Sequence, residues 1–264
     1  MTKNPIDSED FSKAQGHWIL ARMGKRVLRP GGRELTEKLI ESLDINTVDD
    51  IVELAPGLGF TAELSLKHHP KSYTGIDLNA DAIRLLEQKL NGRNVTFIQA
   101  NAAETTLADN SMDKVWGEAM LTMHADHRKT EIIREAHRIL KKGGLYAIHE
   151  LSLLPDNLDP DLKAAIQKDL AMAIKVNARP LTETEWKDLL IREGFKIRKV
   201  ETNTMRLLQL GRIVSDEGFF RTLKIIFNIV ANPQAKRRIL QMRMVFQKYQ
   251  KHIHAIAIIA EKVA

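Results

Sequence analysis

The chain has 264 residues, of which 40 are Lys or Arg and 34 are Asp or Glu, and it contains no cysteine. This length suits one large domain or a domain with an appendage, and the missing cysteine excludes disulfides, thiolate metal sites and a cysteine nucleophile. The formal net charge of +6 would suit nucleic acid or an anionic membrane surface, so the position of this charge along the chain matters.

Residues 1–43 are expected to form helices that become part of a cap. Apolar residues recur at helical spacing on both sides of a break at Pro30-Gly31-Gly32. Trp18 and Met23 are candidates for covering a ligand, with helix core as the simpler interpretation. The N-terminal sequence lacks the apolar centre of a signal peptide, and no apolar run approaches the roughly 18 residues of a membrane span, so we expect a cytoplasmic protein.

Residues 44–205 alternate strand and helix patterns, which predicts a core of βαβ units around a mostly parallel sheet. The predicted strands cover 50–54, 73–77, 95–99, 114–116, 145–149 and 195–204. The predicted helices cover 80–90, 128–140 and 182–193. Asn79 is expected to cap the first, Lys141-Lys142-Gly143-Gly144 to end the second, and Thr182 and Glu185 to form a capping box at the start of the third. Residues 254–264 are expected to form the final strand of this core.

Residues 206–253 form a predicted basic helical insertion, broken at Asn232-Pro233. It contains ten Lys and Arg against only Asp216 and Glu217, so the rest of the chain is slightly acidic. Three interpretations remain open: a helical appendage that packs its apolar face on the core and leaves its bases in solvent, a lid that selects anionic or lipophilic molecules, and a helix on a membrane surface. Nucleic-acid binding is the least favoured, because the segment has no aromatic platform and no known module.

A glycine turn follows the first predicted strand. Gly57 and Gly59 separate this strand from a helix, Glu53 stands just before the turn, and Asp77 ends the next strand. An acid in the position of Asp77 is placed to accept both ribose hydroxyls of a nucleoside cofactor. Glu53 would oppose a pyrophosphate and suits a positively charged cofactor, such as one carrying the ammonium of S-adenosylmethionine. The simpler alternative is a surface acid at Glu53 and a helix cap at Asp77.

Five segments in order carry a family resemblance. They are Glu53–Gly59, Gly75–Leu78, Gln99–Ala103, Ala108–Asp113 and Arg134–Gly144. Over roughly residues 48–151 the chain resembles the class I S-adenosylmethionine-dependent methyltransferases, and more narrowly the subfamily that includes the ubiquinone and menaquinone biosynthesis enzymes and many small-molecule methyltransferases. The resemblance implies an α/β fold: a doubly wound, Rossmann-like sheet of seven mostly parallel strands with a helical cap. It also implies S-adenosyl-L-methionine as cofactor.

The resemblance gives each matched position a role. Glu53 and the backbone of the glycine turn would hold the methionine moiety, Asp77 the ribose and Leu78 the adenine. Asn101 stands where the family usually has aspartate, and its amide oxygen can still accept a hydrogen bond from the adenine amino group. The implied cofactor-binding residues are Glu53, Ala55, Pro56, Gly57, Gly59, Asp77, Leu78, Asn101, Ala102 and Gly117.

Methyl transfer from a sulfonium is an in-line displacement, so the protein must chiefly align the reactants and exclude water. A general base is needed only if the acceptor loses a proton. The candidates near the ends of the fourth and fifth strands are Glu118, His124 and Glu150. A helix-terminal acid is an equal alternative for Glu118, and packing or capping is the simpler role for His124. Although His124, Asp126 and His127 are close in sequence, they make a poor ligand set, and we expect no metal.

The function predicted from the sequence is S-adenosylmethionine-dependent methyl transfer to a small-molecule acceptor. The expected partners are therefore that acceptor, anionic or lipophilic in character, and a weakly contacted membrane surface. Two alternatives remain. One is a non-catalytic regulatory protein that binds a nucleoside cofactor on the same fold, and the other is an RNA methyltransferase that uses the basic insertion.

Overall fold

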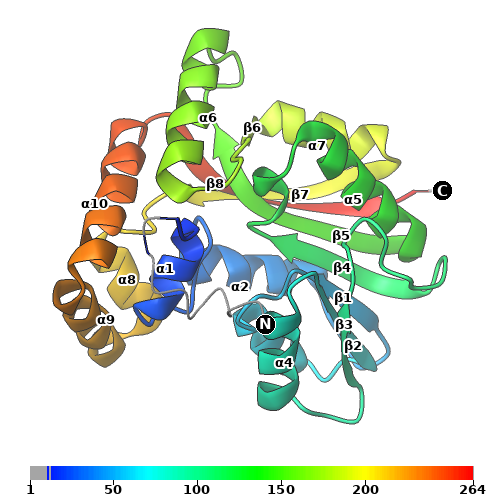
Figure 1. The fold of residues 1–264 in the computed structure, drawn as a ribbon. Helices are drawn as coiled ribbons and strands as arrows, with labels where there is room; N and C mark the ends of the chain where they lie inside the picture. Colours follow the sequence, from blue (N-terminus) through cyan, green and yellow to red (C-terminus); the bar gives the residue numbers. More distant parts are fainter. Residues whose placement is uncertain (1–10, 12, 264) are drawn as a thin grey trace.

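The computed structural model describes residue 11 and residues 13–263, which form an α/β fold around one twisted sheet (Figure 1). The sheet order is β3-β2-β1-β4-β5-β8-β7, with β6 paired to β5, and only β8 runs antiparallel to its neighbours. The strands are β1 (Asp50–Leu54), β2 (Ser72–Asp77), β3 (Val95–Gln99), β4 (Met112–Glu118), β5 (Leu140–Leu153), β6 (Leu181–Thr182), β7 (Phe195–Thr204) and β8 (Ile253–Lys262). The predicted seven-stranded, mostly parallel sheet is confirmed, with the two-residue β6 added.

Helices cover both faces of the sheet because its strands alternate apolar side chains between the two faces. On one face, Val52 and Leu54 of β1 pack in a core with α5 (Asp126–Ile139) and α7 (Glu183–Arg192). On the other, Ile51 packs with α2 (Gly32–Leu43) and α3 (Phe60–Leu66). The helix α4 (Ala80–Lys89) lies near β2 and β3 and begins at Asn79, whose side chain accepts hydrogen bonds from the Asp81 and Ala82 amides. This is the predicted cap.

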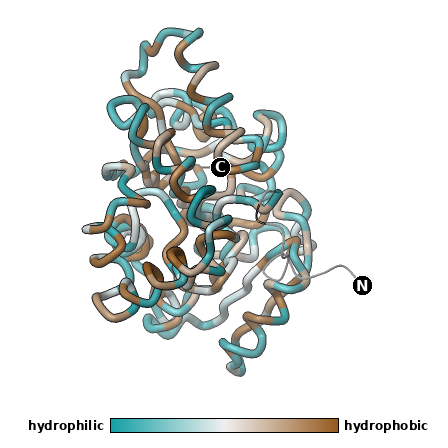
Figure 2. The backbone as a smooth tube through the Cα atoms, turned by 60° about the vertical axis from the view of Figure 1, so that its left-hand side comes forward, coloured by the Kyte–Doolittle hydropathy of each residue, from teal (hydrophilic) through white to brown (hydrophobic). Residues whose placement is uncertain are grey.

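A third hydrophobic cluster joins the outer helices to the end of β5. It includes Leu151 and Leu153 of the strand and residues of the outer helices. These helices are α1 (Gly16–Arg22), α6 (Pro160–Ile174), α8 (Leu210–Glu217), α9 (Phe219–Ala231) and α10 (Pro233–Lys248). Figure 1 shows α1, α8, α9 and α10 together at one side of the sheet, although they are far apart in sequence. Figure 2 brings this side forward and shows hydrophobic and hydrophilic residues mixed along its helices.

Several predicted elements differ in extent from the observed ones. Residues 1–10 and 12, part of the predicted N-terminal helices, lie outside the described residues. The helix α1 ends at Arg22, so residues 24–29, which were predicted to be helical, are not. Lys141–Gly144 belong to β5 rather than to a helix terminus. The insertion breaks at Gly218 as well as at the predicted Asn232. The predicted strand 195–204 and the Thr182–Glu185 capping box are confirmed, while the domain boundaries stay predictions.

Within the described residues, no helix combines the length and apolarity that crossing a bilayer requires.

Candidate active site

The glycine turn lies at the carboxyl end of β1. Ala55, Gly57 and Gly59 all have positive φ angles, 56°, 56° and 76°, which bend the chain sharply between β1 and α3. A Cβ at Gly57 would find its nearest neighbour, the Ala55 carbonyl oxygen, at 4.0 Å, whereas one at Gly59 would meet Leu86 Cδ2 at 2.6 Å. Gly59 is therefore required by the packing of α3 against α4, and Gly57 leaves space for a ligand beside its backbone.

Asp77 and Leu78 lie beside this turn, at the end of β2. One carboxylate oxygen of Asp77 accepts a hydrogen bond from the Asn79 amide at 2.9 Å and the other from the Gly57 amide at 3.4 Å. Burial raises the pKa of Asp77, although these backbone amides oppose the shift. The Leu78 side chain follows with 71% of its surface exposed. A half-buried carboxylate, an open glycine and an exposed apolar side chain thus share one edge of the sheet.

Four further predicted cofactor-binding residues lie in the turns and strands beside this edge. The Asn101 side-chain oxygen accepts a hydrogen bond from the Ala103 amide at 3.0 Å, which closes the turn after β3 around Ala102. An amide oxygen has a second lone pair, so this bond leaves Asn101 one acceptor site. Gly117 of β4 is buried, and a Cβ there would meet Met120 Sδ at 2.8 Å, so its visible role is packing. Pro56 lies in the turn, with its Cγ at 3.3 Å from where a Cβ of Gly75 would stand.

The carboxyl group of Glu53 is buried between strands. The Tyr73 hydroxyl of β2 donates a hydrogen bond to it at 2.6 Å. Burial raises the pKa of Glu53 to about 8, against the opposing effect of that hydrogen bond. A protonated carboxyl carries no charge to attract an ammonium, so the environment of Glu53 differs from the one that its sequence position suggested. Its predicted contact with the methionine moiety stays a prediction.

Glu118, at the end of β4, is the centre of a buried polar cluster. Its carboxylate accepts hydrogen bonds from Arg29, Thr36, Thr61 and His149, the last at 2.7 Å from Nδ1. Burial alone would raise the pKa of Glu118, but the charge of Arg29 and the hydrogen bond from His149 outweigh it and hold that pKa at about 2. Glu118 is therefore ionised at neutral pH.

This polar cluster ties the segment before α2 to the sheet. His149 Nε2 lies 2.6 Å from the Pro30 carbonyl oxygen, and the buried Arg29 guanidinium pairs with Glu118. The cluster thus fixes the loop at Arg29 and Pro30 against the ends of β4 and β5. Sequence reasoning missed Arg29, because nothing local marks a residue whose partner is 89 positions away.

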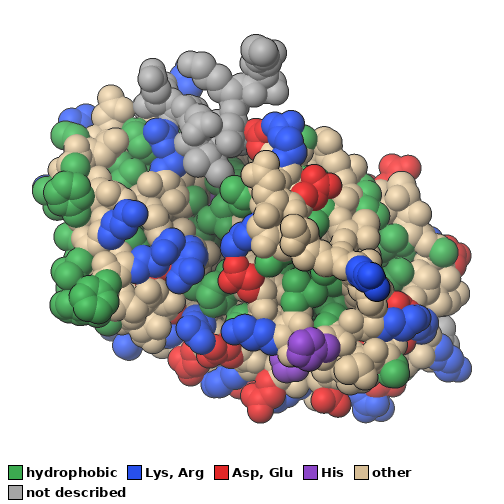
Figure 3. Space-filling model, turned by 90° about the horizontal axis from the view of Figure 1, so that it is seen from below, with side chains coloured by type: hydrophobic (Ala, Val, Ile, Leu, Met, Phe, Trp, Pro, Cys, Tyr) green, Lys and Arg blue, Asp and Glu red, His purple; other side chains and the backbone are tan. Residues whose placement is uncertain are grey.

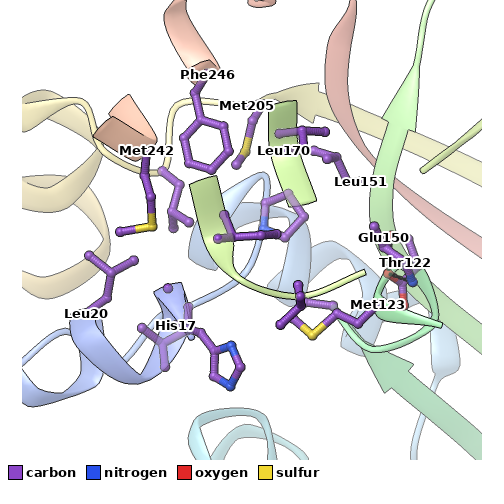
Figure 4. A pocket seen from close by; sticks show the side chains of 17 residues that line it. His17, Leu20, Thr122, Met123, Glu150, Leu151, Leu170, Met205, Met242 and Phe246 are labelled. Atoms are coloured by element: carbon purple, nitrogen blue, oxygen red, sulfur yellow. Dashed lines mark hydrogen bonds between the residues drawn. The ribbon is translucent and has the colours of Figure 1, made fainter. Parts of the chain in front are cut away.

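A pocket opens between the outer helices and the ends of β4 and β5. Figure 4 shows side chains of α1, of α10 and of the segment after β4 turned toward one another. The lining consists of Gly16, His17, Leu20, Leu28, Pro30, Ala119, Thr122, Met123, Glu150, Leu151, Leu170, Ile174, Val176, Met205, Leu207, Met242 and Phe246. Most of these residues are apolar, and neither Lys nor Arg is among them.

The chain is similar in sequence to known proteins over most of its length. The sequence model of a family described as "Methyltransferase domain" matches residues 51–144. An uncharacterized protein of Haemophilus influenzae is 32% identical over 251 residues, which cover 94% of this chain and 98% of the relative. The chain belongs to the class I S-adenosylmethionine-dependent methyltransferases. S-adenosyl-L-methionine is accordingly its cofactor.

Two further relatives of this methyltransferase have named activities. The erythromycin 3''-O-methyltransferase of Saccharopolyspora erythraea is 27% identical over 228 residues, covering 80% of this chain and 72% of the relative. The structure of Haemonchus contortus phosphoethanolamine N-methyltransferase 2, in complex with phosphomonomethylethanolamine and S-adenosylhomocysteine, has a TM-score of 0.73 at 17% identity. It covers 99% of this chain and 60% of that chain. At that identity the second likeness shows the fold alone.

The residues at the carboxyl ends of β1 and β2 fit the cofactor of this methyltransferase. Gly57 leaves room at the turn, Asp77 offers a carboxylate of the kind that ribose hydroxyls require, and Leu78 exposes an apolar surface. When bound, the cofactor supplies a methyl group on a positively charged sulfur, so the protein need not provide a covalent nucleophile. The individual residue roles remain predictions.

The three predicted catalytic residues of the methyltransferase occupy different environments. Glu118 belongs to the buried cluster around Arg29, and Glu150 lines the pocket. The Glu150 carboxylate accepts hydrogen bonds from the backbone amides of Met120, Leu121 and Thr122 and from the Thr122 hydroxyl. It therefore shapes the segment after β4, and burial raises its pKa against these bonds. His124 is half-buried and outside the pocket lining, and burial lowers its pKa.

Proposed function

We propose that this methyltransferase transfers the methyl group to a small, largely apolar acceptor bound in the pocket between the outer helices and the ends of β4 and β5. The observation that carries the proposal is the lining of this pocket. Leu20 of α1, Met205 and Met242 extend apolar side chains toward its interior (Figure 4). Burying an apolar acceptor surface against such walls is favourable by about 25 cal/mol per Å².

The polar groups of the pocket support the same choice. Glu150 already accepts four hydrogen bonds from the segment after β4. Burial lowers the pKa of His17 to about 4, so its imidazole is neutral at pH 7. Because the described residues of the lining include no Lys or Arg, a strongly anionic acceptor would lose its hydration there without gaining a counter-charge from them. Of the two acceptor classes expected from the sequence, the lipophilic one fits this pocket better.

The pocket would assist methyl transfer by positioning the acceptor and excluding water, and it offers no strong base. His17 is too weak a base to deprotonate an ordinary alcohol, and the Glu150 carboxylate is occupied. In-line displacement depends on alignment of the nucleophile, the methyl carbon and the sulfur, which apolar walls can enforce by shape. The relative that is named an erythromycin 3''-O-methyltransferase supports a small-molecule acceptor.

A pair of matched substitutions tests this proposal. Met123→Gln places an amide of similar size in the pocket wall, whereas Met172→Gln makes the same change on the exposed surface of α6. The assay measures transfer of labelled methyl from S-adenosyl-L-methionine to a panel of apolar, anionic and sugar-containing small molecules and to RNA. We expect apolar compounds to be the acceptors and Met123→Gln to lower their kcat/KM about tenfold, because an unpaired amide is costly in an apolar wall.

The control Met172→Gln should leave kcat/KM unchanged, and both variants should bind S-adenosyl-L-methionine as the unmodified enzyme does. Methylation of RNA or of anionic compounds in preference to apolar ones would contradict the proposal, as would equal effects of the two substitutions.

A further inference from the structure

The helix α9 presents an apolar stripe to solvent. Its exposed apolar side chains recur at the spacing of one helical face. They are Phe219, Phe220, Leu223, Ile226, Phe227 and Val230, of which Phe220 is 86% and Phe227 71% exposed. Soluble proteins rarely leave large aromatic side chains so bare on one contiguous face, and such faces mark interaction sites. One interpretation from the sequence was an appendage that packs its apolar face on the core. The helix α9 instead exposes that face to solvent.

Hydrogen bonds fix which side of α9 faces outward. On the inner side, the Arg221 guanidinium donates to the Gly24 carbonyl oxygen at 3.1 Å and the Asn228 amide to that of Met23 at 3.0 Å. Ile225 and Thr222 are buried between these contacts. Arg221 and Asn228 are thus directed toward the segment after α1. Turning the phenylalanines inward would break these bonds, so their exposure is a property of the fold.

The two acids of the insertion point inward as well. Glu217 accepts hydrogen bonds from the backbone amides of Arg26 and Val27 at 2.7 and 2.9 Å. Asp216 accepts from the Arg33 amide at 3.0 Å and lies 3.5 Å from the buried Lys25 ammonium. Both carboxylates are buried. The acids therefore anchor the insertion to the segment before α2 and contribute no negative charge to its surface.

The charged groups that remain exposed on α9 and α10 are all positive. They are Lys224, Lys236, Arg237, Arg243 and Lys248, of which Lys248 pairs with Asp169 of α6. Figure 3 shows exposed hydrophobic side chains gathered at the left, on the side of the outer helices, with Lys and Arg beside them. Exposed aromatics flanked by unopposed bases match an anionic lipid surface, where rings enter the interface and bases meet the headgroups.

We propose that α9, supported by α10, docks this protein on the surface of an anionic lipid bilayer. The 13 residues of α9 span about 20 Å, less than the hydrocarbon thickness of about 30 Å, so the helix lies along the interface with Phe220 and Phe227 inserted. The proposal stands on the exposed surface alone and does not depend on the identity of the methyl acceptor.

Vesicle flotation with the full-length protein tests this proposal. Vesicles of phosphatidylcholine alone are compared with vesicles containing about one-third phosphatidylglycerol. We expect binding to the anionic vesicles only. The double substitution Phe220→Ser/Phe227→Ser should weaken it at least tenfold. Lys224→Gln/Lys236→Gln should weaken it by about twenty-five-fold, since each base near such a surface is worth roughly fivefold in affinity.

The matched control is Val48→Ser/Ile191→Ser, which removes two exposed apolar side chains away from the insertion and should leave binding unchanged. Circular dichroism and Tm verify that each variant folds. If the phenylalanine double variant does not fold, the lysine double variant still tests the proposal. Absence of flotation, equal binding to both kinds of vesicle, or equal losses in control and test variants would overturn the proposal. Ultracentrifugation showing a dimer that the phenylalanine pair abolishes, with flotation unaffected, would assign the stripe to a second copy instead.

Discussion

Two regions differ in how their residues come together: the edge of the sheet where β1 and β2 end, called here the cofactor edge, and the layer formed by the outer helices. At the cofactor edge, the turn after β1 and the residues after β2 meet because neighbouring parallel strands end side by side. The resulting surface combines the Asp77 carboxylate with the exposed Leu78 side chain. In the outer layer, α1, α6 and α10 come from distant parts of the chain and enclose an apolar pocket. Short motifs thus carry the predicted cofactor-binding residues, whereas tertiary packing shapes the pocket in which we propose that the acceptor binds.

The polar cluster around Glu118 connects these two regions, and its removal should have the largest effect. Glu118→Gln leaves the Arg29 guanidinium buried without a counter-charge. We expect the free energy of unfolding to fall by about 3–5 kcal/mol, the usual cost of removing one partner of a buried ion pair, and urea denaturation would measure this loss.

The control for this prediction is Glu63→Gln, which breaks the exposed pair with Lys89 and should cost about 0–1 kcal/mol. If Glu118→Gln kept its stability but lost turnover at unchanged cofactor affinity, Glu118 would act in the chemistry instead of joining the two regions.

Asp77→Ala should affect the cofactor edge alone. It removes the carboxylate beside Gly57, and we expect at least tenfold weaker binding of S-adenosyl-L-methionine by calorimetry, which corresponds to about 1.4 kcal/mol. Glu87→Ala, on the exposed surface of α4, should bind normally. Unchanged affinity of the Asp77 variant would remove the ribose assignment and weaken the view that the motifs define this edge.

Glu53→Gln should give a smaller, pH-dependent effect. Because burial raises the pKa of Glu53 to about 8, the folded state holds this proton more tightly than the unfolded one. Glu53 therefore stabilises the folded state fully below its unfolded pKa, near 4.5, and this stabilisation is lost as the pH rises through 8. The variant cannot ionise, so its Tm should fall less than that of the unmodified protein between pH 6 and about 9. Parallel Tm curves would show that Glu53 is ionised in the fold.

The elements with strong local signals were predicted closely. The capping box at Thr182 and the strand 195–204 agree residue by residue with the structure, since caps and alternation depend on neighbouring residues. Lys141–Gly144 were wrongly assigned to a helix terminus. Leu140 and Leu145 on either side of them pair with β4, and the four residues form the irregularity between these two pairs. The helix α6 escaped prediction because apolar residues are spread around it rather than confined to one face.

The sequence by itself determined the α/β alternation and, through its family resemblance, the cofactor. It also located the glycine turn and Asp77, because each of these depends on residues within one strand–helix unit. Only the tertiary structure decided the partners of Glu118, the apolar lining of the pocket and the direction in which α9 faces. No sequence periodicity can relate two residues that lie as far apart in the chain as Arg29 and Glu118, which form an ion pair, or Asn228 and Met23, which share a hydrogen bond. The fold brings such residues together, and their contacts determine which apolar and charged groups remain at the surface.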